Sequence, residues 1–164
     1  MSTYEAAKIE ASGQEFYQLL QQMASALVDG ETDTIAVMAN LSALLFDHLE
    51  QITWVGFYRM MQDELVLGPF QGKPACVRIA LGKGVCGTAV QRKETQIVKD
   101  VFAFPGHIAC DPASRSELVI PILVGEQVVG VLDLDSAITA RFTEEDAQGL
   151  APIAALVSSS YLVE

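Results

Sequence analysis

The sequence is poor in positive charge. Its 164 residues contain 10 Lys and Arg against 21 Asp and Glu, which gives a net charge of -11. Because such a surface repels phosphate backbones and anionic lipids, we expect neither nucleic acid nor a membrane as a partner. No apolar stretch is long enough to span a bilayer, and residues 1–12 lack the basic and apolar regions of a signal peptide. These absences predict a cytoplasmic protein.

Cysteine is also scarce, with only Cys76, Cys86 and Cys110 in the chain. An odd number without close pairs fits neither a secreted disulfide framework nor a zinc ribbon. In a reducing compartment these residues should be free thiols, or thiols that form a disulfide only as part of a cycle. A zinc site made of the three cysteines and His107 is disfavoured by the irregular ligand spacing, so we expect no metal.

What the sequence has is an ordinary globular composition, with 51% hydrophobic and 19% charged residues. A chain of this length can bury a sizeable core without a covalent staple. We therefore expect one domain over residues 1–164, with disorder only in residues 1–12.

Hydrophobic spacing divides the chain into helices and strands of ordinary length. Thr143 can cap the last helix with Asp146 at the capping-box position, and Pro152 is expected to kink it. The order of elements predicts an α+β fold with a central, mostly antiparallel sheet of about six strands flanked by helices. The expected ranges are helices over 13–28, 33–49 and 87–92, strands over 53–60, 64–70, 75–81, 95–101, 117–124 and 128–135, a loop over 102–116, and a last helix from 142–143 onward.

Three acidic residues lie near the ends of two predicted strands. A period of two places Asp133 and Asp135 on the same face as Val129 and Val131. Counting outward from the hairpin turn places Glu117 roughly opposite Asp133. Two interpretations stay open: the strand simply reaches solvent there, or a pocket at the strand end keeps one carboxyl group protonated.

The three cysteines differ in their predicted surroundings. Cys110 lies in the long polar loop, Cys76 at the start of the third strand, and Cys86 in a glycine turn before the short helix. For any one cysteine the ordinary interpretation is an inert buried thiol, which suits Cys86 best, although a helix N-terminus can lower a thiol pKa. His107 is interpreted as a loop residue that makes hydrogen bonds, and Trp54 as a core residue that could also contact sulfur.

Several stretches together resemble one known family, the free methionine-(R)-sulfoxide reductases, which are single-domain enzymes of the GAF fold. They are WVGFY, LVLGPFQGKPACVRI, GKGVCGTAV, GHIACD, SELVIPILV and GVLDLDS. The resemblance extends from about Trp54 to Phe142 and includes all three cysteines and all three acids. It implies a central antiparallel sheet with helices on one side. A homodimer paired through helices is common among GAF domains.

The resemblance also implies roles for the thiols. Cys110 would be the nucleophile and Cys76 the main resolving thiol, so that these two form the redox disulfide. Cys86 would have a secondary role, and family members differ in which thiol is credited with the first attack. An external thioredoxin-like reductant supplied by NADPH would reduce the disulfide, with no metal or organic cofactor.

By the same resemblance, Glu117, Asp133 and Asp135 would bind and polarise the sulfoxide oxygen of free methionine-(R)-sulfoxide. Trp54 would pack against its S-methyl group. A sulfoxide sulfur becomes electrophilic only when its oxygen is protonated or strongly hydrogen-bonded, and a neutral carboxyl group such as Glu117 can supply that proton.

Two other functions stay open. A non-catalytic GAF module could bind a small ligand, but GAF domains that bind cyclic nucleotides carry an Asn-Lys pair followed by F-x-x-x-D-E. Here the spacing from Phe142 to Asp146 is kept, Ala147 replaces the Glu, and no Asn-Lys pair precedes it. A redox-sensing scaffold would use the same disulfide without a substrate, so only turnover separates it from an enzyme.

Overall fold

The computed structural model describes residues 8–161. Of the segment predicted to be disordered, residues 1–7 lie outside the described residues, and residues 8–12 are irregular with Ile9 packed against the core. No helix in the described range combines the length and hydropathy needed to cross a membrane. The elements are α1 (Gly13–Leu27), α2 (Thr34–His48), β1 (Trp54–Met61), β2 (Glu64–Gln71), β3 (Arg78–Ala80), α3 (Gly84–Arg92), β4 (Gln96–Val98), a 3-10 turn (Val101–Ala103), β5 (Ser116–Val124), β6 (Gln127–Ser136) and α4 (Glu144–Tyr161).

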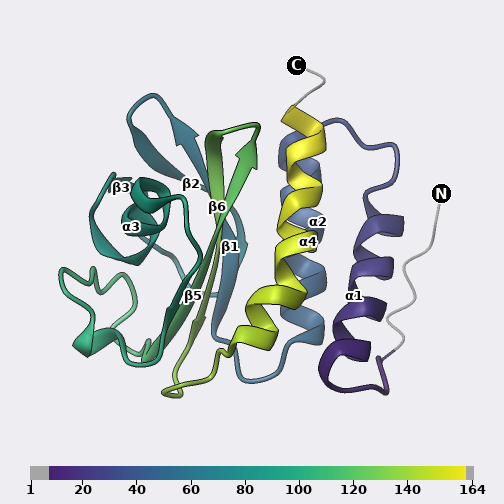
Figure 1. The fold of residues 1–164 in the computed structure, drawn as a ribbon, viewed down its shortest axis with the longest axis horizontal. Helices are drawn as coiled ribbons and strands as arrows, with labels where there is room; N and C mark the ends of the chain where they lie inside the picture. The colour runs from purple at the N-terminus through teal and green to yellow at the C-terminus, as the bar shows by residue number, and fades with distance from the viewer. Residues whose placement is uncertain (1–7, 162–164) are drawn as a thin grey trace.

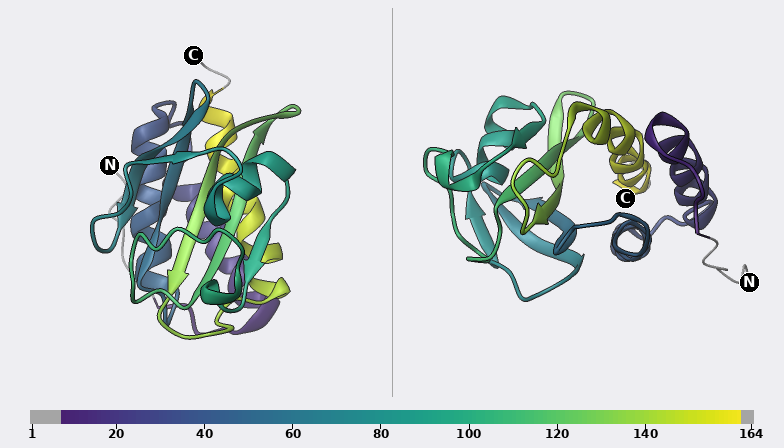
Figure 2. Two further views of the ribbon diagram at one scale, coloured as in Figure 1. Left: turned by 90° about the vertical axis from the view of Figure 1, so that its left-hand side faces the viewer. Right: turned by 90° about the horizontal axis from the view of Figure 1, so that it is seen from below.

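The six strands form one antiparallel sheet in the order β3-β2-β1-β6-β5-β4. The α+β fold predicted from the sequence is confirmed. The long helices α1, α2 and α4 lie on one side of the sheet, and the short helix α3 lies on the other side together with several loops (Figures 1 and 2). Each face of the sheet therefore has its own core.

The two cores differ in size and content. The helical side buries a large cluster of aliphatic and aromatic residues between the sheet and the three long helices. The α3 side buries a smaller cluster that includes Trp54, Tyr58 and Cys86. This smaller core leaves room for polar side chains on the same face, and all the candidate site residues lie there.

Four expectations about local structure need correction. The third strand is shorter than predicted, so Cys76 lies in the loop before β3 and not in the strand. The short helix begins at Gly84, so Cys86 lies within α3. The fourth strand covers only Gln96–Val98, and the predicted loop begins with a 3-10 turn. Both short strands, β3 and β4, are flanked by loops. The alternation of apolar and polar residues does not show where such a strand ends and the loop begins.

The register of the β5–β6 hairpin also differs from the prediction. Glu117 pairs with Asp135, and Val119 pairs with Asp133. A bulge between Ile122 and Leu123, opposite which β6 contains one extra residue, Val129, accounts for one of the two positions by which the pairing of Glu117 differs. Val129 therefore packs toward the helical core and does not share the face of Val131 and Asp133.

The last helix agrees with the capping prediction. The backbone N–H and the hydroxyl of Thr143 donate to Asp146, and the backbone N–H of Asp146 donates to the Thr143 hydroxyl. The helix continues through Pro152, which cannot donate a backbone hydrogen bond to the preceding turn.

Candidate active site

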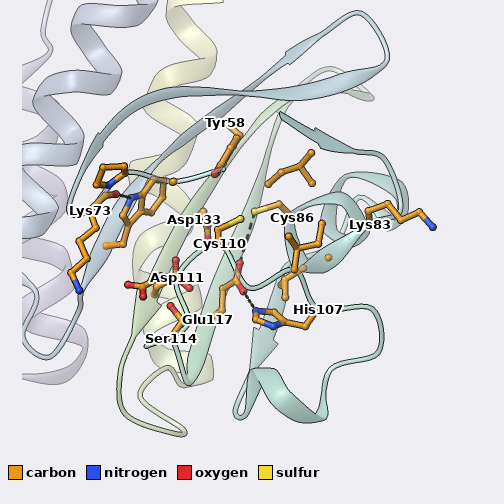
Figure 3. Close-up of a pocket in the computed structure, with 18 residues that line it drawn as sticks. Tyr58, Lys73, Lys83, Cys86, His107, Cys110, Asp111, Ser114, Glu117 and Asp133 are labelled. Atoms are coloured by element: carbon orange, nitrogen blue, oxygen red, sulfur yellow. Dashed lines mark hydrogen bonds and ion pairs between the residues drawn. The ribbon is translucent and has the colours of Figure 1, made fainter. Parts of the chain in front are cut away.

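A pocket opens on the α3 side of the sheet, where β1, β5 and β6 meet two loops and the start of α3 (Figure 3). Cys86, Cys110 and the three acids singled out in the sequence line it, whereas Cys76 is not among its lining residues. Its lining residues are Trp54, Tyr58, Lys73, Pro74, Ala75, Ile79, Lys83, Gly84, Val85, Cys86, His107, Ile108, Cys110, Asp111, Ser114, Glu117, Asp133 and Asp135.

The sheet contributes three carboxyl groups to the floor of this pocket. Glu117 extends from β5, and Asp133 and Asp135 extend from β6 on the same face. Glu117 is 7% exposed and Asp133 is 5% exposed, so the interpretation in which the strand simply reaches solvent is wrong. The Oδ1 atom of Asp133 is buried and accepts no hydrogen bond from the described residues. This arrangement leaves an acceptor open to a donor group of a ligand.

Burial and mutual repulsion change the acidity of all three groups. Burial raises the pKa of Glu117 well above its ordinary value, and the charges of Asp133 and Asp135 raise it further. Burial likewise raises the pKa of Asp133 to about 6, although hydrogen bonds with Glu117 and Cys86 oppose the shift. Burial and the charge of Asp133 raise the pKa of Asp135 well above normal. The trio therefore retains protons at a pH where exposed carboxyl groups are ionised.

Cys86 lies directly beside these acids. It is 3% exposed, and its Sγ atom donates to Oε1 of Glu117 at 3.9 Å. Burial raises the pKa of this thiol, and the nearby charges of Asp133 and Glu117 raise it further. The start of α3 does not offset these effects, so Cys86 stays a neutral thiol that hydrogen-bonds to the acids.

The other two cysteines are joined by a disulfide. Cys76 comes from the loop between β2 and β3, and Cys110 from the long loop before β5, with Cα atoms 5.4 Å apart. They are the pair that the resemblance implies as the redox couple. In Figure 3 the Cys110 side chain lies between Cys86 and Asp133, above Glu117. Chain segments 34 residues apart are therefore linked next to the carboxyl trio.

His107 belongs to the site, which the sequence analysis did not recognise. Its Nε2 atom lies 3.9 Å from Oε2 of Glu117, and Figure 3 shows the ring directed at that carboxyl group. Burial lowers the pKa of His107, so the neutral ring is favoured. The only signal in the sequence was its position three residues before Cys110, because the contact with Glu117 depends on how the loop folds back.

Two aromatic side chains of β1 form one wall. The rings of Trp54 and Tyr58 stack with centroids 6.0 Å apart, and the ring of Phe70 also stacks with Trp54, at 5.2 Å. Both interpretations of Trp54 therefore apply, because it packs in the smaller core and also lines the pocket. The wall offers an apolar surface to a methyl or thioether group.

One group of side chains in the described range could bring three metal ligands together. The Sγ atom of Cys86 and carboxylate oxygens of Glu117 and Asp133 lie within 4.8 Å of one another. A metal would require all three to be deprotonated, whereas burial raises all three pKa values. The zinc ligand set considered from the sequence is also broken, because Cys76 and Cys110 are oxidised to a disulfide.

Comparison with known proteins places the chain in a family. A model described as GAF domain matches residues 16–160. The free methionine-R-sulfoxide reductase of Escherichia coli is 56% identical over 141 residues, which is 86% of each chain. The enzyme of the same name from Saccharomyces cerevisiae is 43% identical over 142 residues, covering 82% of this chain and 79% of the relative.

Solved structures of enzymes with these names are similar to this chain in fold and in sequence. A Staphylococcus aureus fRMsr in complex with substrate is 51% identical with a TM-score of 0.84, covering 88% of this chain and 94% of the other. The free methionine-R-sulfoxide reductase of Neisseria meningitidis, also in complex with its substrate, is 39% identical with a TM-score of 0.92, covering 98% and 96%. By fold and by these relatives, the chain belongs to the GAF domain family and, within it, to the free methionine-R-sulfoxide reductases.

Proposed function

We propose that this protein reduces free methionine-(R)-sulfoxide to methionine through Cys110, with Cys76 as the resolving thiol. One observation supports this assignment above the others: a disulfide between two loops lies next to three buried carboxyl groups with raised pKa values. A thiol pair beside a proton donor is what sulfoxide reduction needs, because the leaving oxygen must be protonated when sulfur is attacked.

Glu117 is the proposed proton donor. Its pKa is raised by burial and by two neighbouring carboxyl groups, so it can hold a proton at neutral pH and donate it to the sulfoxide oxygen. Asp133 and Asp135 help to bind the polar end of the substrate. The negative charge of the trio also suits the ammonium group of a free amino acid, and the aromatic face of Trp54 suits the S-methyl group.

The proposed reaction has two chemical steps, oxygen transfer and disulfide formation. The Cys110 thiol attacks the sulfoxide sulfur, the oxygen passes to the Cys110 sulfur as a sulfenic acid, and methionine leaves. The substrate gains two electrons and the thiol loses two. The Cys76 thiol then attacks the sulfenic acid, which forms the disulfide and releases water. These steps use only thiols and protons, so the reaction requires no metal or organic cofactor.

An external dithiol completes the cycle. It must reduce the Cys76–Cys110 disulfide and become a disulfide itself, which a thioredoxin-like protein supplied with electrons from NADPH would do. Such a reductant is available in the cytoplasm, where we place the protein. The acids beside Cys110 disfavour its thiolate in the resting enzyme. The ammonium group of the bound substrate offsets that effect.

The first experiment is NADPH consumption with thioredoxin and thioredoxin reductase. Three substrates are compared: free methionine-(R)-sulfoxide, its S epimer and a sulfoxide within a peptide. We expect turnover of the free R epimer alone, and its loss in Cys110→Ser. Turnover of the peptide would contradict the proposed preference for the free amino acid. No turnover with any substrate would favour a ligand-binding or redox-sensing module instead.

A further inference from the structure

The loop that carries Cys76 is held by two side chains of a strand. It joins β2 to β3 over residues 72–77 and contains no regular secondary structure. The indole Nε1 of Trp54 donates to the carbonyl oxygen of Lys73 at 3.1 Å. The hydroxyl of Tyr58 donates to the carbonyl oxygen of Cys76 itself at 2.9 Å. Both donors extend from β1.

These donors are rigidly placed. β1 lies inside the sheet, paired with β2 on one side and β6 on the other. Tyr58 is 2% exposed and its ring stacks on Trp54, so neither side chain can change rotamer without disturbing the smaller core. Burial raises the pKa of Tyr58 well above its ordinary value, so its hydroxyl stays protonated and remains a donor.

When the disulfide is reduced, the loop is fixed at Cys76 by these hydrogen bonds and by the packing of Ala75 and Cys76 against the smaller core. Gly72, Lys73 and Pro74 are exposed, and Cys76 is only partly buried. Beyond Cys76, the chain is held again when Val77 accepts a backbone hydrogen bond from Leu67. A disulfide forms only when the two Cα atoms come within about 7 Å, so the position of the Cys76 backbone limits how fast the thiol can reach a sulfenic acid.

We propose that Tyr58 is a positioning residue for the second chemical step: its hydroxyl holds the Cys76 carbonyl so that the Cys76 thiol captures the Cys110 sulfenic acid. The inference rests on the proposed function, and it assigns Tyr58 no part in oxygen transfer. Its ring packs in the smaller core, and its hydroxyl donates the hydrogen bond to the loop.

The test separates the two steps with a single turnover of pre-reduced enzyme. Released methionine reports oxygen transfer, and dimedone-trapped Cys110 measured against disulfide reports capture of the sulfenic acid. We expect Tyr58→Phe, which keeps the ring in the pocket wall, to slow disulfide formation roughly tenfold more than it slows release of the first methionine, because one buried hydrogen bond to the loop is lost. The dimedone adduct should increase accordingly, and Cys76→Ser sets its upper limit.

Tyr17→Phe is the matched control. It also removes a buried tyrosine hydroxyl, which hydrogen-bonds to Asp146 on the helical side of the sheet. A general loss of stability would affect both variants alike, whereas only Tyr58→Phe should change the partition between adduct and disulfide. A normal rate of disulfide formation in Tyr58→Phe would overturn the proposal. So would an equal slowing of methionine release, since Tyr58 would then act in oxygen transfer.

A second experiment forms the sulfenic acid without methionine sulfoxide, so its result does not depend on the proposed function. Hydrogen peroxide also converts a reactive Cys110 thiol to sulfenic acid, with release of water and without methionine sulfoxide. In this arm Trp54→Phe, which removes the other donor to the loop, should shift the partition toward the dimedone adduct as Tyr58→Phe does. If wild type releases no methionine but both variants shift the partition under peroxide, the proposed function fails and the role of Tyr58 stands. An unchanged partition under peroxide overturns that role.

Discussion

In the proposed mechanism, Glu117 and Asp133 have different protonation states. Asp133 has a pKa raised to about 6, so it is ionised at neutral pH. Burial raises the pKa of Glu117, and the charge of Asp133 favours its protonated form further. Two carboxyl groups with different environments thus reach different protonation states, one able to donate a proton and one able to accept a hydrogen bond.

Replacing Glu117 with Gln keeps its shape and removes its transferable proton. We expect kcat for free methionine-(R)-sulfoxide to fall by about 100-fold or more while KM changes little, as for loss of a general acid. The measurement is steady-state turnover with the thioredoxin system. Glu94→Gln, at an exposed position, is the control and should leave kcat unchanged. Equal kcat in Glu117→Gln and wild type would contradict the proton-donor role.

Asp133 should lower stability at the pH where the enzyme works. Its pKa is higher in the folded state than in the unfolded chain, so between about pH 4 and pH 6 the folded state binds more protons, and stability falls as pH rises. Above pH 6 the loss is complete. Asp133→Asn should therefore be more stable than wild type by on the order of 2–3 kcal/mol at pH 7 and nearly equal to it at pH 4.

Urea denaturation of the disulfide form at pH 4 and pH 7 measures the stability difference between Asp133→Asn and wild type. Asp63→Asn removes a charge from an exposed position and serves as the control. A stability difference between Asp133→Asn and wild type that does not depend on pH would show that the buried charge is not its cause.

At the scale of elements, the bulge in β6 brings the acids together. Extending the register of the hairpin from Val124 and Gln127 without a bulge would pair Glu117 with Leu134, whose side chain faces the helical core. The extra residue moves the pairing by one position and places Glu117 opposite Asp135, on the face with the pocket. One inserted residue therefore decides whether three carboxyl groups share a face.

This bulge also marks how far the sequence could predict the structure. The main helices and the inner strands have clear periodicity, and the prediction located them within a few residues. A bulge breaks the period of two without a strong signal of its own; Gly130 beside it was the only indication. A Cβ atom there would lie 2.5 Å from the carbonyl oxygen of Tyr58.

Some site residues could likewise be predicted from the sequence, and others could not. Glu117 and Asp133 could be singled out because like charges that converge at one end of a sheet repel each other, and Cys110 because a thiol in a long polar loop is unusual. His107 and Tyr58 could not, since their roles depend on contacts across the fold. The Phe142-to-Asp146 spacing has a structural explanation: Phe142 is buried in the helical core, and Asp146 accepts hydrogen bonds from Tyr17 and Arg141.

Helices α1 and α4 are in close contact where Gly149 lies against the Tyr17 ring. A Cβ atom on Gly149 of α4 would lie 2.1 Å from the Tyr17 ring of α1. Gly149→Ala should therefore destabilise the protein by about 1–3 kcal/mol, although alanine favours a helix by about 1 kcal/mol over glycine. Urea denaturation measures the change. Ser159→Ala, at an exposed position of the same helix, should cause no loss, and a stabilised Gly149→Ala would contradict the predicted overlap.

The whole molecule has two faces with different tasks. On the helical side, three long helices cover the sheet and bury the larger core. On the other side, one short helix and two loops cover the smaller core and the pocket. The disulfide joins these two loops, so the proposed catalytic cycle would change the covalent connection on this face and leave the helical face intact. We therefore expect oxidation to affect global stability and local motion differently.

Global stability should be higher in the oxidised form. The disulfide closes a loop between residues 34 positions apart, and restricting the unfolded chain in this way corresponds to about 4 kcal/mol. Denaturation with and without a reductant measures the difference. Cys76→Ser lacks the disulfide, so its stability should match the reduced wild type under both conditions. A difference that persisted in Cys76→Ser would come from the reductant and not from the disulfide.

Local motion should change only around the pocket. Breaking the disulfide leaves residues 72–77 held by the hydrogen bonds from Trp54 and Tyr58, and residues 104–115 held mainly by short-range backbone hydrogen bonds. Amide hydrogen exchange should therefore speed up on reduction in both loops, while α2 and β1 keep their protection. Faster exchange in α2 would mean that the disulfide stabilises the whole fold. Unchanged exchange in both loops would mean that the pocket does not open on reduction, and the substrate would then have to enter by another route.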